Sequence, residues 1–413
     1  MALMNYLPSF SVLLLLAVSA RAGAAVTSAA PSAPPAVNWQ TGEGVSLGGV
    51  LFPHVHLNSA YGRTNSSLGH ELGAGHHDPV EDGWTVQGVE LGFSGRWNDH
   101  FETYVVWHGF WENEDPNGFG HELEEYFLKL KDLTGGFDIR AGRFLSRFGL
   151  HNATHLHGWD WADNFLVNGR FLGDDGQYTE GAEVTWNLPV KWSSAVSMAA
   201  GRAKAPEHEE EDEHEEHEEA LFEGEGAAFD DMLYTINWTN IWEMNDFHKL
   251  RGGLSYAWGD NTWNRMASVF GAHLEYVWQK NGPDPGGNYL RWRTEVMLRD
   301  VKAIGEHHEE EEEKEEVITG SFDEVGIYSS VVYGFDISRG TLEAGLRADW
   351  VEGVSAAGLP ERTRFSPAVS WYLNDTRNAW LRVQYNRDQI QDSGSEDSVW
   401  LGAGFNWGGA EVR

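Results

Sequence analysis

The stretch LRWRTEVMLR, residues 290–299, decides the fold class of this chain. Leu290 and Trp292 alternate along it with Arg291 and Arg293, and the alternation continues to residue 299. Because successive side chains of a β-strand point to opposite faces, this period of two predicts a strand with one apolar and one charged face. A soluble β-sandwich would need a second sheet to cover the apolar face, whereas a membrane barrel turns that face to lipid.

The same period of two recurs along the chain, for example in residues 379–386 and 399–407, and sixteen such segments can be counted. The links between them alternate in character, since long polar links are followed by short turns such as 134–136. Bacterial barrels have short periplasmic turns and long extracellular loops, and an even number of strands. The sequence therefore predicts an all-β protein, a transmembrane antiparallel β-barrel of 16 strands.

The start of the chain has the pattern of an exported protein. A short apolar core followed by small residues predicts a cleaved signal peptide over residues 1–24. Residues 25–44 predict a flexible linker, and residues 45–413 the barrel. The 413-residue chain contains no cysteine and no later run of 18 apolar residues, which excludes helical membrane spans. We expect it in the outer membrane of a Gram-negative-type bacterium.

Histidine and acidic residues gather in the long links. The run EHEEEDEHEEHEEA, residues 207–220, is the densest example, in a chain of net charge −35. Imidazole and carboxylate groups bind zinc and similar divalent ions. Crowded carboxylates also favour imidazolium, so we expect weak binding that falls between pH 7 and 5. The candidate ligands in the loops 61–83, 203–229 and 302–323 are His70, His76, His77, His208, His214, His217, His307 and His308.

One other interpretation of these loops stays open, and an enzymatic one is rejected. A solvated acidic coat would have the same carboxylates without binding a metal. The spacing His214-Glu-Glu-His217 is one residue short of the zinc-protease helix signature, and serine and histidine are scattered without the arrangement of a hydrolase. We therefore predict that the protein is not an enzyme.

Residues 142–176 read GRFLSRFGLHNATHLHGWDWADNFLVNGRFLGDDG. This stretch resembles a family of outer-membrane proteins identified as zinc-regulated TonB-dependent receptors, whose barrel looks like the phosphate-selective porin type. The family pattern falls on Asn152, His155, His157, Trp159, Asp160, Trp161, Asp163 and Gly173–Gly176. The resemblance implies a role in zinc acquisition. Because fewer than 25 residues separate the expected cleavage site from the first strand, we expect no plug domain and an unplugged diffusion pore.

The third long link, residues 146–180, is the predicted constriction, by analogy with porins in which this loop folds inward. Asp160 and Asp163, together with His155 and His157, would offer a cation a polar step inside the mouth. Arginine rungs on a lumen wall can conduct anions, or can be neutralised by acids across the lumen. The predicted pore-lining residues are Arg140, Arg291, Arg293, Arg347, Arg382, Glu295 and Asp349.

These features predict a diffusion channel that collects divalent metal ions, zinc first among them, on its extracellular loops and passes them to the periplasm. No cofactor is required, because the metal is cargo. The alternatives are an anion or phosphate-type porin with a surface coat of acidic loops, and a surface protein that displays or buffers metal without transport. Expected partners are outer-membrane lipid, the metal ion or another small solute, and further copies of the chain in a homotrimer; no nucleic acid is expected.

Overall fold

The computed structural model describes residues 50–64, 73–79, 82–111, 119–203, 222, 227–284, 286–309, 314–374 and 377–408, without the side chains of 306–317. The predicted signal peptide and linker, residues 1–24 and 25–44, lie outside the described residues, as does the start of the predicted barrel.

The described residues form sixteen strands and three short helices. The strands are β1 (Leu51–Thr64), β2 (Gly83–Trp97), β3 (Phe101–Trp111), β4 (Phe119–Leu133), β5 (Phe137–Leu145), β6 (Tyr178–Asn187), β7 (Ser193–Ala203), β8 (Phe229–Asn245), β9 (His248–Asn261), β10 (Met266–Gln279), β11 (Tyr289–Glu309), β12 (Lys314–Asp336), β13 (Thr341–Val351), β14 (Arg362–Tyr372), β15 (Ala379–Ile390) and β16 (Gly394–Gly408). The helices are η2 (Leu156–Gly158), α1 (Leu166–Leu172) and η4 (Ser355–Ala357). None of the helices in the described part is long and apolar enough to cross a membrane.

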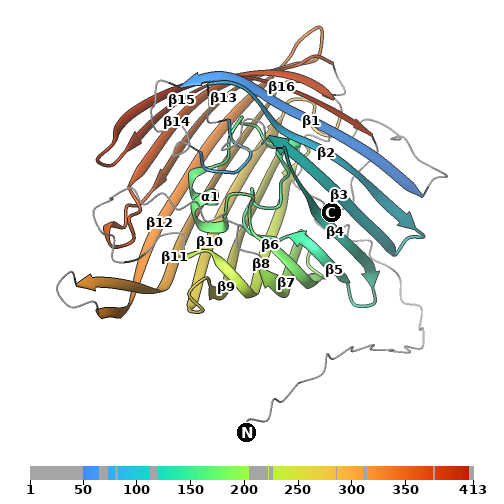
Figure 1. Ribbon diagram of the computed structural model, residues 1–413. Helices are drawn as coiled ribbons and strands as arrows, with labels where there is room; N and C mark the ends of the chain where they lie inside the picture. Colours follow the sequence, from blue (N-terminus) through green and yellow to red (C-terminus); the bar gives the residue numbers. More distant parts are fainter. Residues whose placement is uncertain are drawn as a thin grey trace.

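The strands close into one antiparallel barrel. Each strand pairs with its neighbours in sequence, and β1 pairs with β16 to complete the ring (Figure 1). Closure leaves no sheet edge with unpaired backbone groups, which is what a sheet in lipid requires. The prediction of an all-β, 16-stranded antiparallel barrel is confirmed.

Burial is inverted relative to a soluble protein. Leu381 and Val383 are 47% and 50% exposed, whereas Arg382 between them is 4% exposed. The outer face is therefore apolar and the inner face polar, as in membrane barrels. Exposed aromatic residues stand near both ends of the strands, as in the girdles at membrane interfaces. They include Trp84, Trp111 and Phe119 at one end and Trp97, Trp186, Trp371 and Trp407 at the other.

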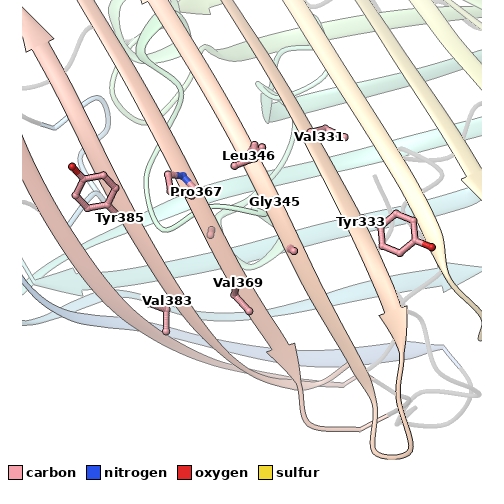
Figure 2. Close-up of a pocket in the computed structure, with 10 residues that line it drawn as sticks. Val331, Tyr333, Gly345, Leu346, Pro367, Val369, Val383 and Tyr385 are labelled. Atoms are coloured by element: carbon pink, nitrogen blue, oxygen red, sulfur yellow. The ribbon is translucent and has the colours of Figure 1, made fainter.

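The outer face also has a shallow apolar groove over β12 to β15. Figure 2 shows Leu346, Pro367 and Val383 on neighbouring strands around it. The small Gly345 and Ala344 form part of its lining. Its residues are those of the lipid-facing surface, so the groove belongs to the outside of the barrel and not to a passage through it.

The links follow the predicted alternation only in part, because those after β9 and β15 are short and the hairpin of β11 and β12 is longer than predicted. The segment 302–323 was expected as a loop, but β11 continues to Glu309 and β12 begins at Lys314. The period of two persists there, since Val301 and Ala303 are buried and Lys302 between them is exposed. A continued strand pattern extends the hairpin, so the predicted loop shrinks to its tip.

The link between β5 and β6, residues 146–177, folds into the barrel; we call it the inner loop. Its helix α1 lies inside the ring of strands, beside β11, β12 and β13 (Figure 1). Apolar residues of the loop pack against the inner wall, and the ring of Phe165 stacks on Tyr328 at 3.7 Å between centroids. Trp161 is 2% exposed in this cluster. The predicted boundary at residue 180 moves to 177, because β6 begins at Tyr178.

Candidate metal centre

Acidic side chains tie the inner loop to one wall of the barrel. Asp163 accepts hydrogen bonds from Arg347 Nη1 at 2.8 Å and from Arg364 Nη1 at 2.9 Å. Asp160 pairs with Arg291 and with Arg293, the latter at 3.2 Å. We call these arginines, with Arg382, the basic wall. Burial opposes the ionisation of Asp160 and Asp163, but the guanidinium groups outweigh it and hold the pKa of both carboxyls below the ordinary value.

This arrangement corrects one prediction. Asp160 and Asp163 were expected to join His155 and His157 in a cation step, but they face the basic wall, whereas the two histidines face β1 to β4. The reason is charge complementarity, since each carboxylate meets arginines and each imidazole meets glutamates. Asp160 is therefore an ion-pair partner of the wall and no longer a candidate metal ligand.

The other predicted pore-lining residues also lie on the inner face. Arg382 donates to the backbone oxygens of Trp159 and Trp161. Arg140 pairs with Glu183 at 2.9 Å, and Asp349 accepts from Arg347 at 2.6 Å. Their charges are neutralised or bound within the wall. Glu295 accepts hydrogen bonds from the backbone N–H of Leu150 and from the Tyr328 hydroxyl, so it too holds the inner loop.

The opposite wall carries histidine and glutamate in one rung across β1 to β4. The strand register pairs His56 with Glu90, Glu90 with His108, and His108 with Glu122. All four side chains belong to the inner face, and Glu90 and His108 are 0% and 1% exposed. The rung climbs towards the end of the barrel that bears the long links. Sheet pairing alone thus alternates imidazole and carboxylate over four neighbouring strands.

The inner loop adds two histidines to this rung. His157 Nδ1 lies 2.6 Å from Glu90 Oε2, and the His157 ring stacks on His56 at 3.7 Å between centroids. His155 Nδ1 lies 3.0 Å from Glu124 Oε2, while its Nε2 lies 2.8 Å from Glu125 Oε2. His155 is the N-cap of η2 and His157 lies within it, and both rings face the same wall.

The segment 73–79, between β1 and β2, brings two further histidines; we call it the mouth segment. Asp78 fixes it, since its carboxylate accepts the backbone N–H groups of Ala74 and Gly75 and, at 2.7 Å, that of Asn164 in the inner loop. His77 then lies over β3, with its ring centroid 4.3 Å from that of His108.

Asp175 of the inner loop lies against both histidines of the mouth segment. Its Oδ1 lies 3.3 Å from His77 Nε2, and its Oδ2 lies 3.7 Å from His76 Nδ1. Burial, followed by His108, lowers the pKa of His77 to about 3, so its ring is neutral at neutral pH. Burial also disfavours the protonation of His76, but Asp175 outweighs it and raises the pKa of His76. The pKa values of the two adjacent histidines are thus shifted in opposite directions.

Three groups of side chains bring their ligand atoms within 4.8 Å of one another: Glu90–Glu124–His155, His56–Glu90–His157 and His77–His108–Glu122. We call the first the inner triad and the last the outer triad. Within the described residues, Glu90, Glu124 and Glu125 form ion pairs with histidines and with no arginine or lysine. Buried carboxylates without a fixed cation are costly, and a divalent cation with histidine co-ligands would compensate them.

The predicted loop ligands lie mostly outside the described residues. This holds for His70, His208, His214 and His217, and for the side chains of His307 and His308, whose backbones belong to β11. Of the others, His76, His77, His155 and His157 all lie near the rung.

Sequence reasoning missed the wall residues themselves: His54, His56, Glu90, His108, Glu124 and Glu125. The alternation that predicted the strands contained the signal, because His54 and His56 share the polar face of β1. These residues lie in strands, outside the links from which the candidate ligands were predicted.

Comparisons with known proteins agree with the barrel fold. No family model matches the chain. An uncharacterised protein of Aquifex aeolicus (strain VF5) is 38% identical over 71 residues, which are 17% of this chain and 15% of that protein's length. OprB of Pseudomonas putida has a TM-score of 0.51 at 11% identity, over 87% of this chain and 94% of that one. An anion-selective porin of Comamonas acidovorans has a TM-score of 0.49 at 14% identity, over 86% and 98%. The likeness to OprB shows a shared porin-type barrel.

Proposed function

We propose that this protein is an outer-membrane diffusion channel for divalent metal ions, with zinc as the first candidate, and that the ions bind inside the barrel on the wall of β1 to β4. The observation that carries the proposal is the set of buried carboxylates Glu90, Glu124 and Glu125, which among the described residues form ion pairs with histidines and with no arginine or lysine. The acidic loops predicted from the sequence would raise the local cation concentration above this wall.

The chemistry of this wall suits passage better than permanent storage. Zinc prefers imidazole nitrogen and carboxylate oxygen, and binds fully enclosed four-ligand sets most firmly. Here the ligands come from β2, β4 and the inner loop, so the site opens if the loop shifts. Conduction needs binding that is favourable enough to admit the ion and weak enough to release it.

The alternative of an anion pathway rests on the basic wall. Its arginines are already engaged, since Arg291 pairs with Asp160, Arg347 with Asp163, and Arg382 with backbone oxygens. A phosphate would have to displace those partners. The geometry therefore favours a cation pathway over an anion pathway. The homotrimer stays a prediction.

The test is the reversal potential and single-channel current of the full chain in planar bilayers, with and without micromolar zinc. We expect cation selectivity and a current that zinc reduces reversibly. Exchanging Glu90 and Glu124 for glutamine should weaken the zinc effect by about tenfold or more, as loss of metal-site partners does. Each exchange is made singly, and the matched control for each is Glu180→Gln, which removes one charge from an exposed position on β6.

Three outcomes would count against the proposal. Anion selectivity without a response to zinc would move the function to the basic wall. Absence of any conductance would favour a displaying or buffering surface protein. An equal loss of the zinc effect in Glu180→Gln would show that general surface charge, and not the wall, is responsible.

A further inference from the structure

The outer triad and the inner triad share no residue, yet they touch. Glu124 Oε2 of the inner triad lies 3.7 Å from His108 Nδ1 of the outer triad and 3.0 Å from His155 Nδ1. We propose that the outer triad, His77–His108–Glu122, is a second zinc-class metal site on the long-link side of the first, and that an ion passes from it to the inner triad between His108 and Glu124. This inference rests on the proposed function, because a hand-over needs the inner site as receiver.

The ligand set of the outer triad is that of a zinc site. Two imidazoles and one carboxylate come from the mouth segment, β3 and β4, with ligand atoms within 4.8 Å of one another. Two histidines and a glutamate are a recurrent zinc set that leaves a fourth position for water or another ligand. Three separate elements supply the three ligands, so the closed fold and not a local motif builds the site.

The imidazoles of the outer triad have unmet hydrogen-bonding capacity. His108 is 1% exposed, and neither of its ring nitrogens has a hydrogen-bond partner among the described residues. His77 is 7% exposed, and its Nδ1 likewise has none within the described part of the chain. A buried polar atom without a partner costs about 1–3 kcal/mol, so such atoms gathered at one point indicate a ligand.

Neighbouring groups orient the ligands. Arg143 donates to Glu122 Oε2 at 2.9 Å, which leaves Oε1 of that carboxylate for a metal. Asp175 Oδ1 lies 3.3 Å from Nε2 of His77, whose Nδ1 is then the nitrogen left for coordination. Carboxylates that hold the second nitrogen of a histidine are a common support of metal sites.

Exposure gives the path a direction. The side chain of Glu122 is 24% exposed, and those of Asp175 and His76 are 31% and 40% exposed. The side chains of His155, Glu90 and Glu124 are 0%, 1% and 7% exposed. Solvent thus reaches the outer triad first, and the inner triad lies behind it.

The short separation also supplies a reason for release. Two divalent ions in adjoining sites repel each other, and ions in multi-site channels displace their neighbours in this way. An ion that enters the outer triad would therefore favour departure of the one in the inner triad, with Glu124 between them.

The test counts zinc ions bound per chain, by equilibrium dialysis of the full-length protein in detergent followed by metal analysis. His77→Asn and Glu122→Gln each remove one outer ligand, and Glu124→Gln removes one inner ligand. The control is His121→Gln, because His121 is an exposed histidine beside Glu122 on β4. Zinc held by the acidic loops contributes equally to every variant and cancels in the difference from this control.

We expect each of the three single variants to bind one zinc ion fewer than His121→Gln. Unchanged stoichiometry in both His77→Asn and Glu122→Gln, with loss in Glu124→Gln, would overturn the second site and leave the proposed function standing. Unchanged stoichiometry in all three would overturn both. Loss of two ions from any single exchange would show that the outer and inner triads form one shared metal centre, and not two sites between which an ion passes. His77 lies outside the strands, so its variant keeps the test valid if the exchange in β4 prevents folding.

Discussion

His155 Nδ1 lies 3.0 Å from Glu124 Oε2, and this contact joins the inner loop to β4. Asp163, eight residues later, joins the same loop to arginines of the opposite wall. Asp160 and Asp163 of the inner loop thus lie towards the basic wall, and His155 and His157 lie towards the glutamates of β2 and β4. It spans the barrel interior and is held on both sides.

The ion pairs of Asp163 should contribute most to the stability of the inner loop. Asp163→Asn removes a carboxylate that accepts from Arg347, Arg364, Gln384 and Asn386. Breaking a buried ion pair costs about 3–5 kcal/mol, and we expect about 3 kcal/mol here, because Arg347 keeps Asp349 and Arg364 keeps Asp388. Thermal unfolding in detergent would measure the loss, and conductance should rise as the loop detaches.

The control for that change is Asp397→Asn. Asp397 pairs with Arg387 at 2.8 Å, but the two side chains are 34% and 43% exposed, respectively. Solvent screens such a pair, so little change is expected. Equal destabilisation of the two variants would show that the inner loop gains nothing from its anchoring at Asp163.

The inner loop should also loosen in acid because of His151. Its Nε2 lies 2.9 Å from Asn164 Oδ1, and burial, followed by Arg293, lowers its pKa from 6.5 to about 3. Between these two values the unfolded loop binds the proton and the folded loop does not. Stability of the folded loop therefore falls as pH drops from 6.5 towards 3, by up to about 1.4 kcal/mol per pH unit from this group.

His151→Gln isolates that contribution, because glutamine fills similar space and does not titrate. We expect the variant to lose less stability than the natural chain between pH 6.5 and 4, measured as protection of residues 146–177 from hydrogen exchange. Parallel pH profiles for the two chains would assign the acid sensitivity to other groups, such as the carboxylates of the loop.

The fold was predictable because its signal is repeated in every strand. The alternation at Leu290 and Arg291 recurs sixteen times, and lipid outside with charge inside permits only a closed barrel. Strand ends were less predictable, since polar residues at the strand tips resemble loop residues. β4 begins at Phe119, which places Glu122 in the wall and not in a link.

The metal centre was less predictable, because it depends on register. A bulge shifts the pairing of β3 with β4 between Val106 and Trp107. As a result the consecutive residues Glu124 and Glu125 are both buried on the inner side, at 5% and 2% exposure. A strict period of two would place one of the two side chains on the outer face, and no local sequence pattern predicts the bulge. His155 and His157 were recognised as candidates, but their glutamate partners come from strands far away in sequence.

The mouth segment should depend on a glycine in α1. A Cβ at Gly169 would lie 1.6 Å from the backbone oxygen of Ala74, and backbone cannot swing aside. Gly169→Ala should push residues 73–79 away from the inner loop, at a cost of about 1–3 kcal/mol, and carry His77 away from His108. Hydrogen exchange of 73–79 would report the displacement. In the control Gly252→Ala, the new methyl group meets the flexible Leu274 side chain at 3.3 Å, and exchange in 73–79 should not change.

The lipid-facing surface makes a prediction that does not involve the inner loop. Leu346, 49% exposed, lies in the middle of β13 and borders the apolar groove of Figure 2. An arginine there would meet lipid near the membrane midplane, and we expect Leu346→Arg to cost about 2–4 kcal/mol. The matched control is Leu342→Arg, because position 342 is on the same face of β13 but near its end, where the cost falls to about 0–1 kcal/mol. Unfolding of both variants in lipid vesicles would measure the difference. Equal and small costs would mean that this face of the barrel does not meet hydrocarbon.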